Sequence, residues 1–417
     1  MTAAISPVGS ARGVFSRRDF RLYFCGLSIG TLANEMLAVV VAWQVYDIAR
    51  SPLALGYVGL AQFVPMAAFA ITAGDLADRL DRRMILAAAY SVQAVGAALF
   101  LLITIVGPAA IWPFYGVLAL FGAARAFSLP TGQSLLPLIV VEEQFPQALA
   151  WTTTARQIGV VVGPALGGAI YLLGPAAAYC VCMVLLLGVA AAAVSIRTRS
   201  KARPLDSDST TFERLTAGIR FVRTKKIILG SISLDLFAVL LGGATALLPI
   251  YARDILYVGP TGLGLLRSAP ALGGTVVGIL LGRAPLRRKI GVTMFACVAL
   301  FGLATIVFGI SHSFALSLAL LAILGGADMV SINVRHMIVQ LATPDVMRGR
   351  VSAVSSLFIG ASNQLGEFES GITAQWFGTV PSVVIGGIGT IVVVGLWTWL
   401  FPDLREVDTM SDVIANR

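Results

Sequence analysis

The sequence predicts an all-α polytopic membrane protein, with twelve transmembrane helices in two pseudo-repeated six-helix bundles. The 417 residues are 57% hydrophobic and 12% charged, which is about half the charged fraction of an ordinary soluble domain. Apolar runs of about 20 residues or more, long enough to cross a bilayer as helices, recur along the whole chain. A soluble protein of this length would need more polar residues on its surface, so we expect the excess of apolar side chains to face lipid.

The apolar runs give twelve expected spans. They lie near residues 20–48, 53–73, 84–106, 111–138, 151–173, 175–196, 227–251, 261–282, 290–310, 314–341, 350–374 and 380–401. Similar loops recur at similar places in the two halves, which is typical of two parallel repeats around a central cavity.

One long polar segment divides the expected spans. A linker at 197–226 separates a first bundle at 1–196 from a second bundle at 227–401, and 402–417 forms a tail. Within the linker, apolar residues recur at helical spacing while arginines occupy the other faces. This pattern predicts a helix, lying either in the membrane interface or on the protein as a solvated linker helix. The apolar residues are Phe212, Leu215, Ile219 and Val222.

The basic residues predict the orientation of the chain. If both termini are cytoplasmic, most of the 30 lysines and arginines fall in cytoplasmic loops, as the positive-inside rule requires of a protein in the cell inner membrane. The net charge of +9 is then a topology signal. These charges lie beside the spans without the interleaved aromatic residues of a nucleic-acid-binding groove, so no nucleic-acid partner is expected.

Several functional classes have no support in the sequence. The four cysteines (Cys25, Cys180, Cys182 and Cys297) all lie in apolar runs, which favours packing roles over a disulfide framework or a metal site. We expect neither a metal nor a cofactor. The chain has no nucleotide-binding loop, no His-Glu-x-x-His pair and no serine nucleophile elbow, so an enzyme is not expected. A membrane receptor is a weaker alternative, because a receptor would not need acidic residues in four separate spans.

A charged decapeptide, Gly74–Arg83, connects the second and third apolar runs. It resembles the loop between spans two and three of the major facilitator superfamily, Gly-x-x-x-Asp-Arg-x-Gly-Arg-Arg. The matching residues are Gly74, Asp78, Arg79, Arg82 and Arg83, while Asp81 stands at the second glycine of the motif. We expect glycine to make the hairpin turn. The resemblance implies a cytoplasmic gate that latches the two bundles together. A solvated loop that only sets topology would explain the arginines equally well, although not the interleaved acids.

A second motif lies in the fifth expected span. Gly159, Gly163, Pro164, Gly167 and Gly168 fill every defined position of the pattern Gly-x-x-x-Gly-Pro-x-x-Gly-Gly. Glycines at helical spacing allow a neighbouring helix to approach closely, and the proline bends the span. The pattern resembles the antiporter motif of proton-coupled drug exporters in the same superfamily. The alternative interpretation is a generic packing face of small residues.

The resemblance extends along nearly the whole chain to the enterobactin-exporter-like branch of the superfamily. It is carried by Trp43–Asp47, Ser51–Gly56, Gly264–Pro270 and Thr343–Asp345. Members of this branch export siderophores, macrolides or other drugs. The resemblance therefore implies a monomeric secondary transporter that exports an amphipathic organic solute in exchange for protons. Its partners would be a small-molecule cargo, protons and the lipid bilayer. A proton-coupled uptake symporter is the alternative within transport.

Ionisable residues inside the spans are the candidates for the transport site. A charged group at the bilayer centre costs about 2.5–3.5 kcal/mol on insertion scales, so each one needs a partner or a water-filled cavity. The sequence places such groups, with neighbouring polar residues on the same helical faces, in the first, fourth, seventh, tenth and eleventh spans. They are Asn34, Glu35, Arg125, Asp235, Asp328, Arg335, Asn363, Gln364 and Glu367. Structural ion pairs, such as Arg125 with an acid or Asp328 with Arg335, are the alternative role.

Overall fold

The protein is helical throughout the part of the chain that the computed structural model describes, which comprises residues 12–107, 110–198, 211–409 and 412. The first half contains six long helices and one short one. They are α1 (Arg12–Phe15), α2 (Arg18–Ala49), α3 (Pro52–Arg79), α4 (Arg82–Val106), α5 (Trp112–Ile139), α6 (Phe145–Ile170) and α7 (Pro175–Ser195). Short 3₁₀ turns at Glu142–Gln144 and Tyr171–Leu173 flank α6.

The second half repeats this pattern after the linker. It contains α8 (Thr211–Thr224), α9 (Lys226–Leu241), α10 (Leu248–Ile250), α11 (Gly259–Arg283), α12 (Ile290–Gly309), α13 (Phe314–Ala342), α14 (Asp345–Phe377), α15 (Thr379–Leu400) and α16 (Pro402–Arg405). Ten helical segments of the described chain are long and apolar enough to cross a membrane. The 28-residue α5 and the 33-residue α14 occupy the two remaining expected positions.

The seventh expected span, at 227–251, lies within a candidate membrane span at Lys226–Ile255, but its helix is interrupted. Helix α9 ends before Gly242, and the chain continues through a 3₁₀ turn, α10 and a π-helical turn at Tyr251–Ile255. The reason is close packing at the break. A β-carbon on Gly243 would lie 2.5 Å from the carbonyl oxygen of Gly366 on α14, and glycine permits such an approach of two backbones.

The connection between α3 and α4 also differs from the prediction. Gly74 lies inside α3, so it does not make the turn. The turn is made after Arg79 instead, and Asp81 is the N-cap of α4, with its carboxylate accepting hydrogen bonds from the Arg83 backbone N–H (3.3 Å) and Nε (2.8 Å). Aspartate is among the preferred N-cap residues. Helix capping thus explains why this chain has aspartate where the superfamily motif has glycine.

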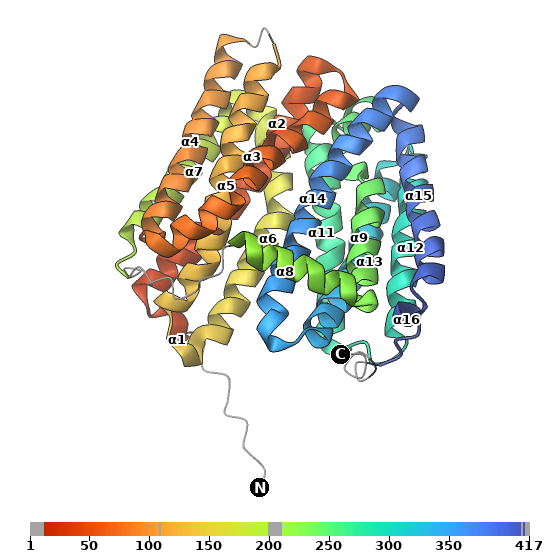
Figure 1. Cartoon of the computed structure of the whole chain (residues 1–417). Helices are drawn as coiled ribbons and strands as arrows, with labels where there is room; N and C mark the ends of the chain where they lie inside the picture. Colours follow the sequence, from red (N-terminus) through yellow and green to blue (C-terminus); the bar gives the residue numbers. More distant parts are fainter. Residues whose placement is uncertain (1–11, 108–109, 199–210, 410–411, 413–417) are drawn as a thin grey trace. The chain divides into compact units, whose positions relative to one another are not determined.

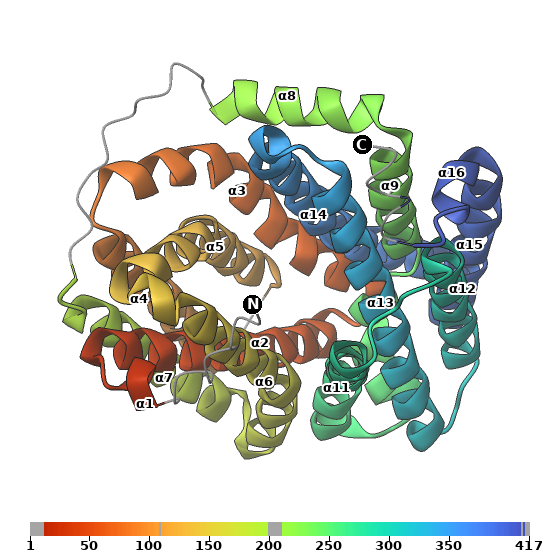
Figure 2. The same cartoon turned by 90° about the horizontal axis from the view of Figure 1, so that it is seen from below.

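The chain forms two compact units. The first contains the chain up to Leu37, Val64–Gly163 and the segment from Gly174 into the linker, and the second contains Ala38–Phe63, Pro164–Leu173 and the chain after the linker. In the first unit α4 packs against α5 and α7, and in the second α13 packs against α11 and α12 (Figures 1 and 2). Three helices, α2, α3 and α6, pass from one unit to the other.

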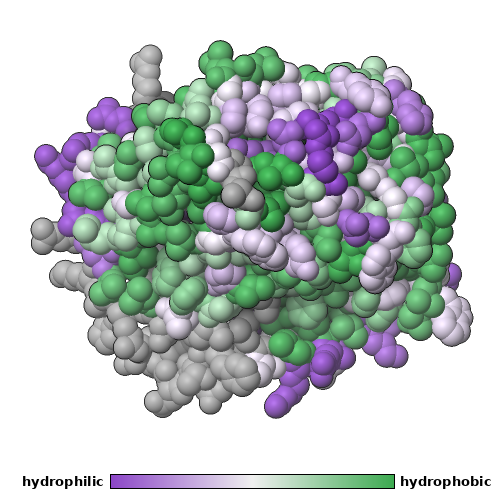
Figure 3. Space-filling view, turned by 90° about the horizontal axis from the view of Figure 1, so that it is seen from above, coloured by the Kyte–Doolittle hydropathy of each residue, from purple (hydrophilic) through white to green (hydrophobic). Residues whose placement is uncertain are grey.

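Hydrophobic residues fill the interior of each unit and also cover much of its surface. Phe20 and Leu135 are fully buried in the first unit, as are Ile228 and Ile338 in the second. Exposed hydrophobic side chains occur on most of the long helices, and one of them, Ile105 on α4, is 68% exposed. A space-filling view shows hydrophobic atoms over wide areas and strongly hydrophilic atoms in smaller patches (Figure 3). Such a surface is suited to lipid.

The predicted linker helix is present as α8, and its described apolar residues pack on the second unit. Val222 is buried and Ile219 lies against the same core cluster, whereas Arg220 and Arg223 are exposed. A β-carbon on Gly218 would lie 2.8 Å from the Arg350 carbonyl oxygen. The apolar side chains of Phe212 and Leu215 lie outside the described residues. Helix α8 therefore packs on protein along the face that is described.

The N-cap of α4 can be tested by mutation. Asp81→Ala should lower the free energy of unfolding by about 1 kcal/mol, because the first turn of α4 loses its side-chain acceptor. Thermal unfolding of the purified protein in detergent measures this change. Asp81→Asn is the control, since asparagine also caps helices and should retain most of the stability. Equal melting temperatures for Asp81→Ala and the wild type would contradict the capping role.

Candidate functional site: a polar cavity and buried charges

A cavity of about 400 Å³ lies in the first unit. Its size falls in the range of about 300–1,000 Å³ that is typical of small-molecule sites. Helices α2, α4, α5, α6 and α7 contribute its walls, whose area is mainly apolar but which carry many polar side chains. The polar residues include Tyr23, Thr31, Asn34, Glu35, Tyr90, Gln93, Arg125, Ser128, Gln133, Thr152 and Arg156.

Three residues predicted from the sequence meet in this cavity. Asn34 and Glu35 come from α2 and Arg125 comes from α5, and all three are partly buried. The Asn34 side chain donates a 2.8 Å hydrogen bond to the Gly30 carbonyl oxygen. The cavity thus offers both a carboxylate and a guanidinium within apolar walls.

The glycines of the antiporter-like motif determine how α2 packs at this cavity. A β-carbon on Gly159 would lie 2.9 Å from Thr31 Cγ2, and one on Gly163 would lie 2.6 Å from Glu35 Cβ and 3.1 Å from the Leu32 carbonyl oxygen. Any larger residue at these positions would push α2 away. The motif therefore holds the segment of α2 that carries Glu35 directly against α6.

The rest of the motif lies in the second unit. A β-carbon on Gly168 would collide with the Pro260 carbonyl oxygen and would lie 3.2 Å from Gly264 Cα on α11. Gly167 and Pro164 are buried. The same ten residues thus pack on α2 at one end and on α11 at the other.

The second unit holds a buried ion pair between α9 and α13. Arg335 and Asp235 form it, and they are only 2% and 6% exposed. Asp235 also borders a cavity of about 10 Å³ together with Asp328 and Ser331, a volume close to that of one water. An ion pair of Asp328 with Arg335 was the alternative in the sequence, but the structure pairs Arg335 with Asp235.

The predicted stripe on α14 belongs to the second unit. Gln364 and Glu367 are partly buried against α3, where a β-carbon on Gly59 would collide with the carboxylate of Glu367 and lie 2.9 Å from Gln364 Oε1. Asn363 is exposed. The structure therefore brings Gln364 and Glu367 together beside Gly59 and leaves Asn363 exposed.

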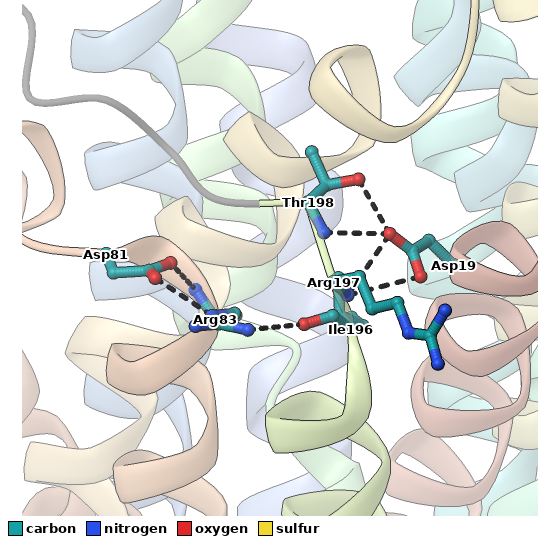
Figure 4. A network of polar contacts seen from close by, with 6 residues as sticks. All are labelled: Asp19, Asp81, Arg83, Ile196, Arg197 and Thr198. Atoms are coloured by element: carbon teal, nitrogen blue, oxygen red, sulfur yellow. Dashed lines mark hydrogen bonds and ion pairs between the residues drawn. The ribbon is translucent and has the colours of Figure 1, made fainter.

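Two arginines of the predicted gate donate hydrogen bonds to carbonyl oxygens within the first unit, and Figure 4 shows the bond made by Arg83. Arg83 donates a 2.7 Å hydrogen bond to the carbonyl oxygen of Ile196, the C-cap of α7, and Arg82 donates one of 2.9 Å to the Ser134 carbonyl oxygen on α5. Cations near helix C-termini are stabilised by the helix dipole. The side chains of Asp78 and Arg79 and the surroundings of Gly74 lie outside what the structure describes.

Beside Arg83, the start of the linker is held by Asp19 at the first turn of α2. Its carboxylate accepts hydrogen bonds from the Arg197 and Thr198 backbone N–H groups and from the Thr198 hydroxyl, the last at 2.6 Å (Figure 4). Arg83 of α4 and Asp19 of α2 therefore both hold the segment that follows α7.

A charged cluster that was not predicted from the sequence lies between the C-terminal end of α2 and the π-helical turn at Tyr251–Ile255. Asp47 pairs with Arg253, and Asp254 accepts a hydrogen bond from the Tyr46 hydroxyl. Arg253 also lies over the Trp43 ring, 5.5 Å from its centroid. The signal was present in the sequence, because Arg253 is one of few basic residues expected outside the cytoplasmic loops. Gln93 is buried but not ionisable, so the cost of placing a charge in the membrane gives no signal for it in the sequence.

Membrane-crossing helices arranged as a repeated set of six, with a polar cavity and buried charges, define a secondary transporter of the major facilitator superfamily. A family model described as transmembrane secretion effector matches residues 10–416. The chain belongs to this family and is a transporter of the efflux branch rather than an enzyme. Its cargo is a small molecule, and the protein is embedded in the membrane through multiple spans.

Known proteins support the same assignment along the whole chain. The enterobactin exporter EntS of Citrobacter koseri is 24% identical over 395 residues, covering 93% of this chain and 92% of the relative. The macrolide efflux protein A of Streptococcus pyogenes is 21% identical over 402 residues, covering 93% and 97%.

A solved structure of a bacterial homologue of the human lysosomal transporter Spinster has a TM-score of 0.72 at 13% identity, and it covers 94% of this chain and 97% of that one. The nucleoside transporter NupG gives 0.71 at 13% identity, covering 92% and 100%. At such identities the likeness establishes the fold. It confirms twelve helices in two six-helix bundles.

The buried pair in the second unit gives a stability prediction. Asp235→Asn should lower the free energy of unfolding by about 3–5 kcal/mol, because Arg335 would remain buried without a counter-charge. Thermal unfolding in detergent measures the effect.

The double variant Asp235→Asn/Arg335→Gln is the control, since it removes both charges and should recover much of the loss. A double variant no more stable than Asp235→Asn would show that the pair itself does not carry the effect.

Proposed function

We propose that the protein exports an amphipathic organic solute, siderophore-like or drug-like, across the inner membrane in exchange for protons by alternating access. The observation that carries this proposal is the cavity of about 400 Å³ in the first unit, where Glu35 and Arg125 lie among apolar side chains. Apolar walls suit the hydrophobic part of such a solute, and a titratable acid beside a cation suits proton exchange.

The packing of the antiporter-like motif supports proton coupling at Glu35. Coupling requires a group whose proton affinity differs between the states of the transport cycle, because a group that binds protons equally in all states transmits nothing. Gly163 packs directly on Glu35. A movement of α6 therefore changes the surroundings of this carboxylate, which is the property that an exchanger needs.

The names of the relatives support the direction and class of cargo. One is named as an exporter of enterobactin and another as a macrolide efflux protein. Because their identities to this chain are below 25%, transport of each cargo by this protein must be measured directly.

The transport assay uses the full-length protein in proteoliposomes under an imposed pH gradient. Enterobactin and a macrolide are each loaded on the side that corresponds to the cytoplasm. Exchange predicts that cargo leaves while protons enter, and that the flux stops when the gradient is collapsed. Cargo and protons moving in the same direction would instead establish uptake symport. Absence of flux for both cargoes would contradict the proposed cargo class.

Glu35→Gln should abolish proton-driven export while cargo binding survives. The amide resembles the carboxyl group in shape but cannot exchange a proton. Efflux under a pH gradient and binding in detergent together measure this separation.

Asp235→Asn is the comparison at the corresponding position of the second half, and its thermal stability must be measured alongside because Arg335 loses its partner. Wild-type export with unchanged pH dependence in both variants would exclude these acids and direct the test to Asp328 and Glu367.

We also propose that both termini are cytoplasmic. Arg288 and Ile310 flank α12 and are both exposed, so cysteines at these two positions report opposite sides of the membrane. In a variant without the native cysteines, Arg288→Cys should react with an impermeant maleimide only from the cytoplasm and Ile310→Cys only from outside. The reverse pattern would invert the topology.

A further inference from the structure

Gln93 of α4 is a buried amide with no hydrogen-bond partner in the described structure. The residue is 1% exposed and lines the polar cavity of the first unit. Neither Nε2 nor Oε1 has a partner among the described residues. Buried polar groups are normally hydrogen-bonded, and a native exception needs an explanation.

Three hydroxyl groups that line the same cavity do not share this property. The Tyr23 hydroxyl donates to the Gly132 carbonyl oxygen at 2.8 Å, and those of Thr31 and Thr152 donate to carbonyl oxygens of their own helices at 2.9 and 3.0 Å. These hydroxyls are satisfied by the protein itself. Gln93 differs from these hydroxyls, because neither atom of its amide has a partner among the described residues.

We propose that Gln93 is a specificity-determining residue that recognises a neutral polar group of the cargo, such as a hydroxyl or a carboxamide. An amide offers one acceptor and two donors, so it complements a group that both donates and accepts. This inference rests on the proposed function, because it assigns part of the proposed cargo site. Charged groups of the cargo would instead meet Glu35 and Arg125, which line the same cavity.

The proposal explains why a destabilising residue is present at this position. A site built to hydrogen-bond its substrate rejects analogues that lack the group, because its buried polar atoms then stay unpaired. A leucine at position 93 would fill a similar volume without unpaired atoms. Stability alone would therefore favour leucine, and glutamine indicates selection of cargo.

The first measurement is independent of any cargo. Gln93→Leu in the full-length protein should unfold at the same temperature as the wild type or at a higher one, because it removes unpaired buried atoms without breaking a contact. Gln340→Leu is the matched control, since Gln340 is exposed on α13. A melting temperature of Gln93→Leu well below those of the control and the wild type would show a structural role and overturn the proposal.

The second measurement compares two probes by thermal shift and equilibrium binding. Erythromycin carries hydroxyl and carbonyl groups, whereas tetraphenylphosphonium has neither hydrogen-bond donors nor acceptors. We expect Gln93→Leu to weaken erythromycin binding about tenfold, the effect of one neutral hydrogen bond, and to leave tetraphenylphosphonium binding unchanged. Gln340→Leu should alter neither.

Other outcomes separate this proposal from the proposed function. Unchanged erythromycin binding in Gln93→Leu, or an equal loss for both probes, would overturn the role of Gln93 and leave export intact. If the wild-type protein bound tetraphenylphosphonium but not erythromycin, the role of Gln93 would also be overturned. Binding of neither probe would count against the proposed cargo class, and the stability of Gln93→Leu would then decide the role of Gln93.

Discussion

Close approach of helix backbones at glycine is the constraint on which the rest of this structure depends. Helices in a membrane gain little from hydrophobic association, because lipid is as apolar as leucine, so small residues that permit close contact hold them together. Gly163 brings α6 onto α2 in the first unit, and a β-carbon on Gly371 of α14 would lie 2.8 Å from Gly56 Cα of α3 in the second. The same contacts position two charged side chains, because Glu35 packs against Gly163 and Glu367 packs against Gly59.

The two halves of the protein satisfy their membrane charges in different ways. In the first unit, Glu35 and Arg125 border a cavity large enough for a small molecule. In the second, Asp235 is buried against Arg335, beside a space of about 10 Å³. The small space beside this pair leaves little room for cargo. The cost of removing the two charges from water is offset by the attraction between them. The repeat therefore preserves the helices but not the polar chemistry within them.

The sequence predicted the helices well because bilayer thickness sets their length and apolar composition marks them directly. It predicted α8 from helical spacing, and it predicted three residues of the cavity, Asn34, Glu35 and Arg125, from the cost of charge in lipid and from the polar neighbours of charged groups. It failed where tertiary contacts decide the result. The break at Gly242 and Gly243 depends on the Gly366 backbone, the pairing of Arg335 depends on a helix about 100 residues away, and Gln93 is recognisable only once its surroundings are known.

Helix α6 links these features to conformational change. Gly159 and Gly163 pack on α2 in the first unit, while Gly168 packs on α11 in the second. The division between the units falls between Gly163 and Pro164, where proline lacks the backbone N–H that would strengthen the helix. A rearrangement of one unit with respect to the other would involve all three helices that pass between the units, and in α6 the boundary lies next to Gly163. Since that glycine contacts Glu35, the deformable part of the helix and the acid proposed to carry the proton are a single packing unit.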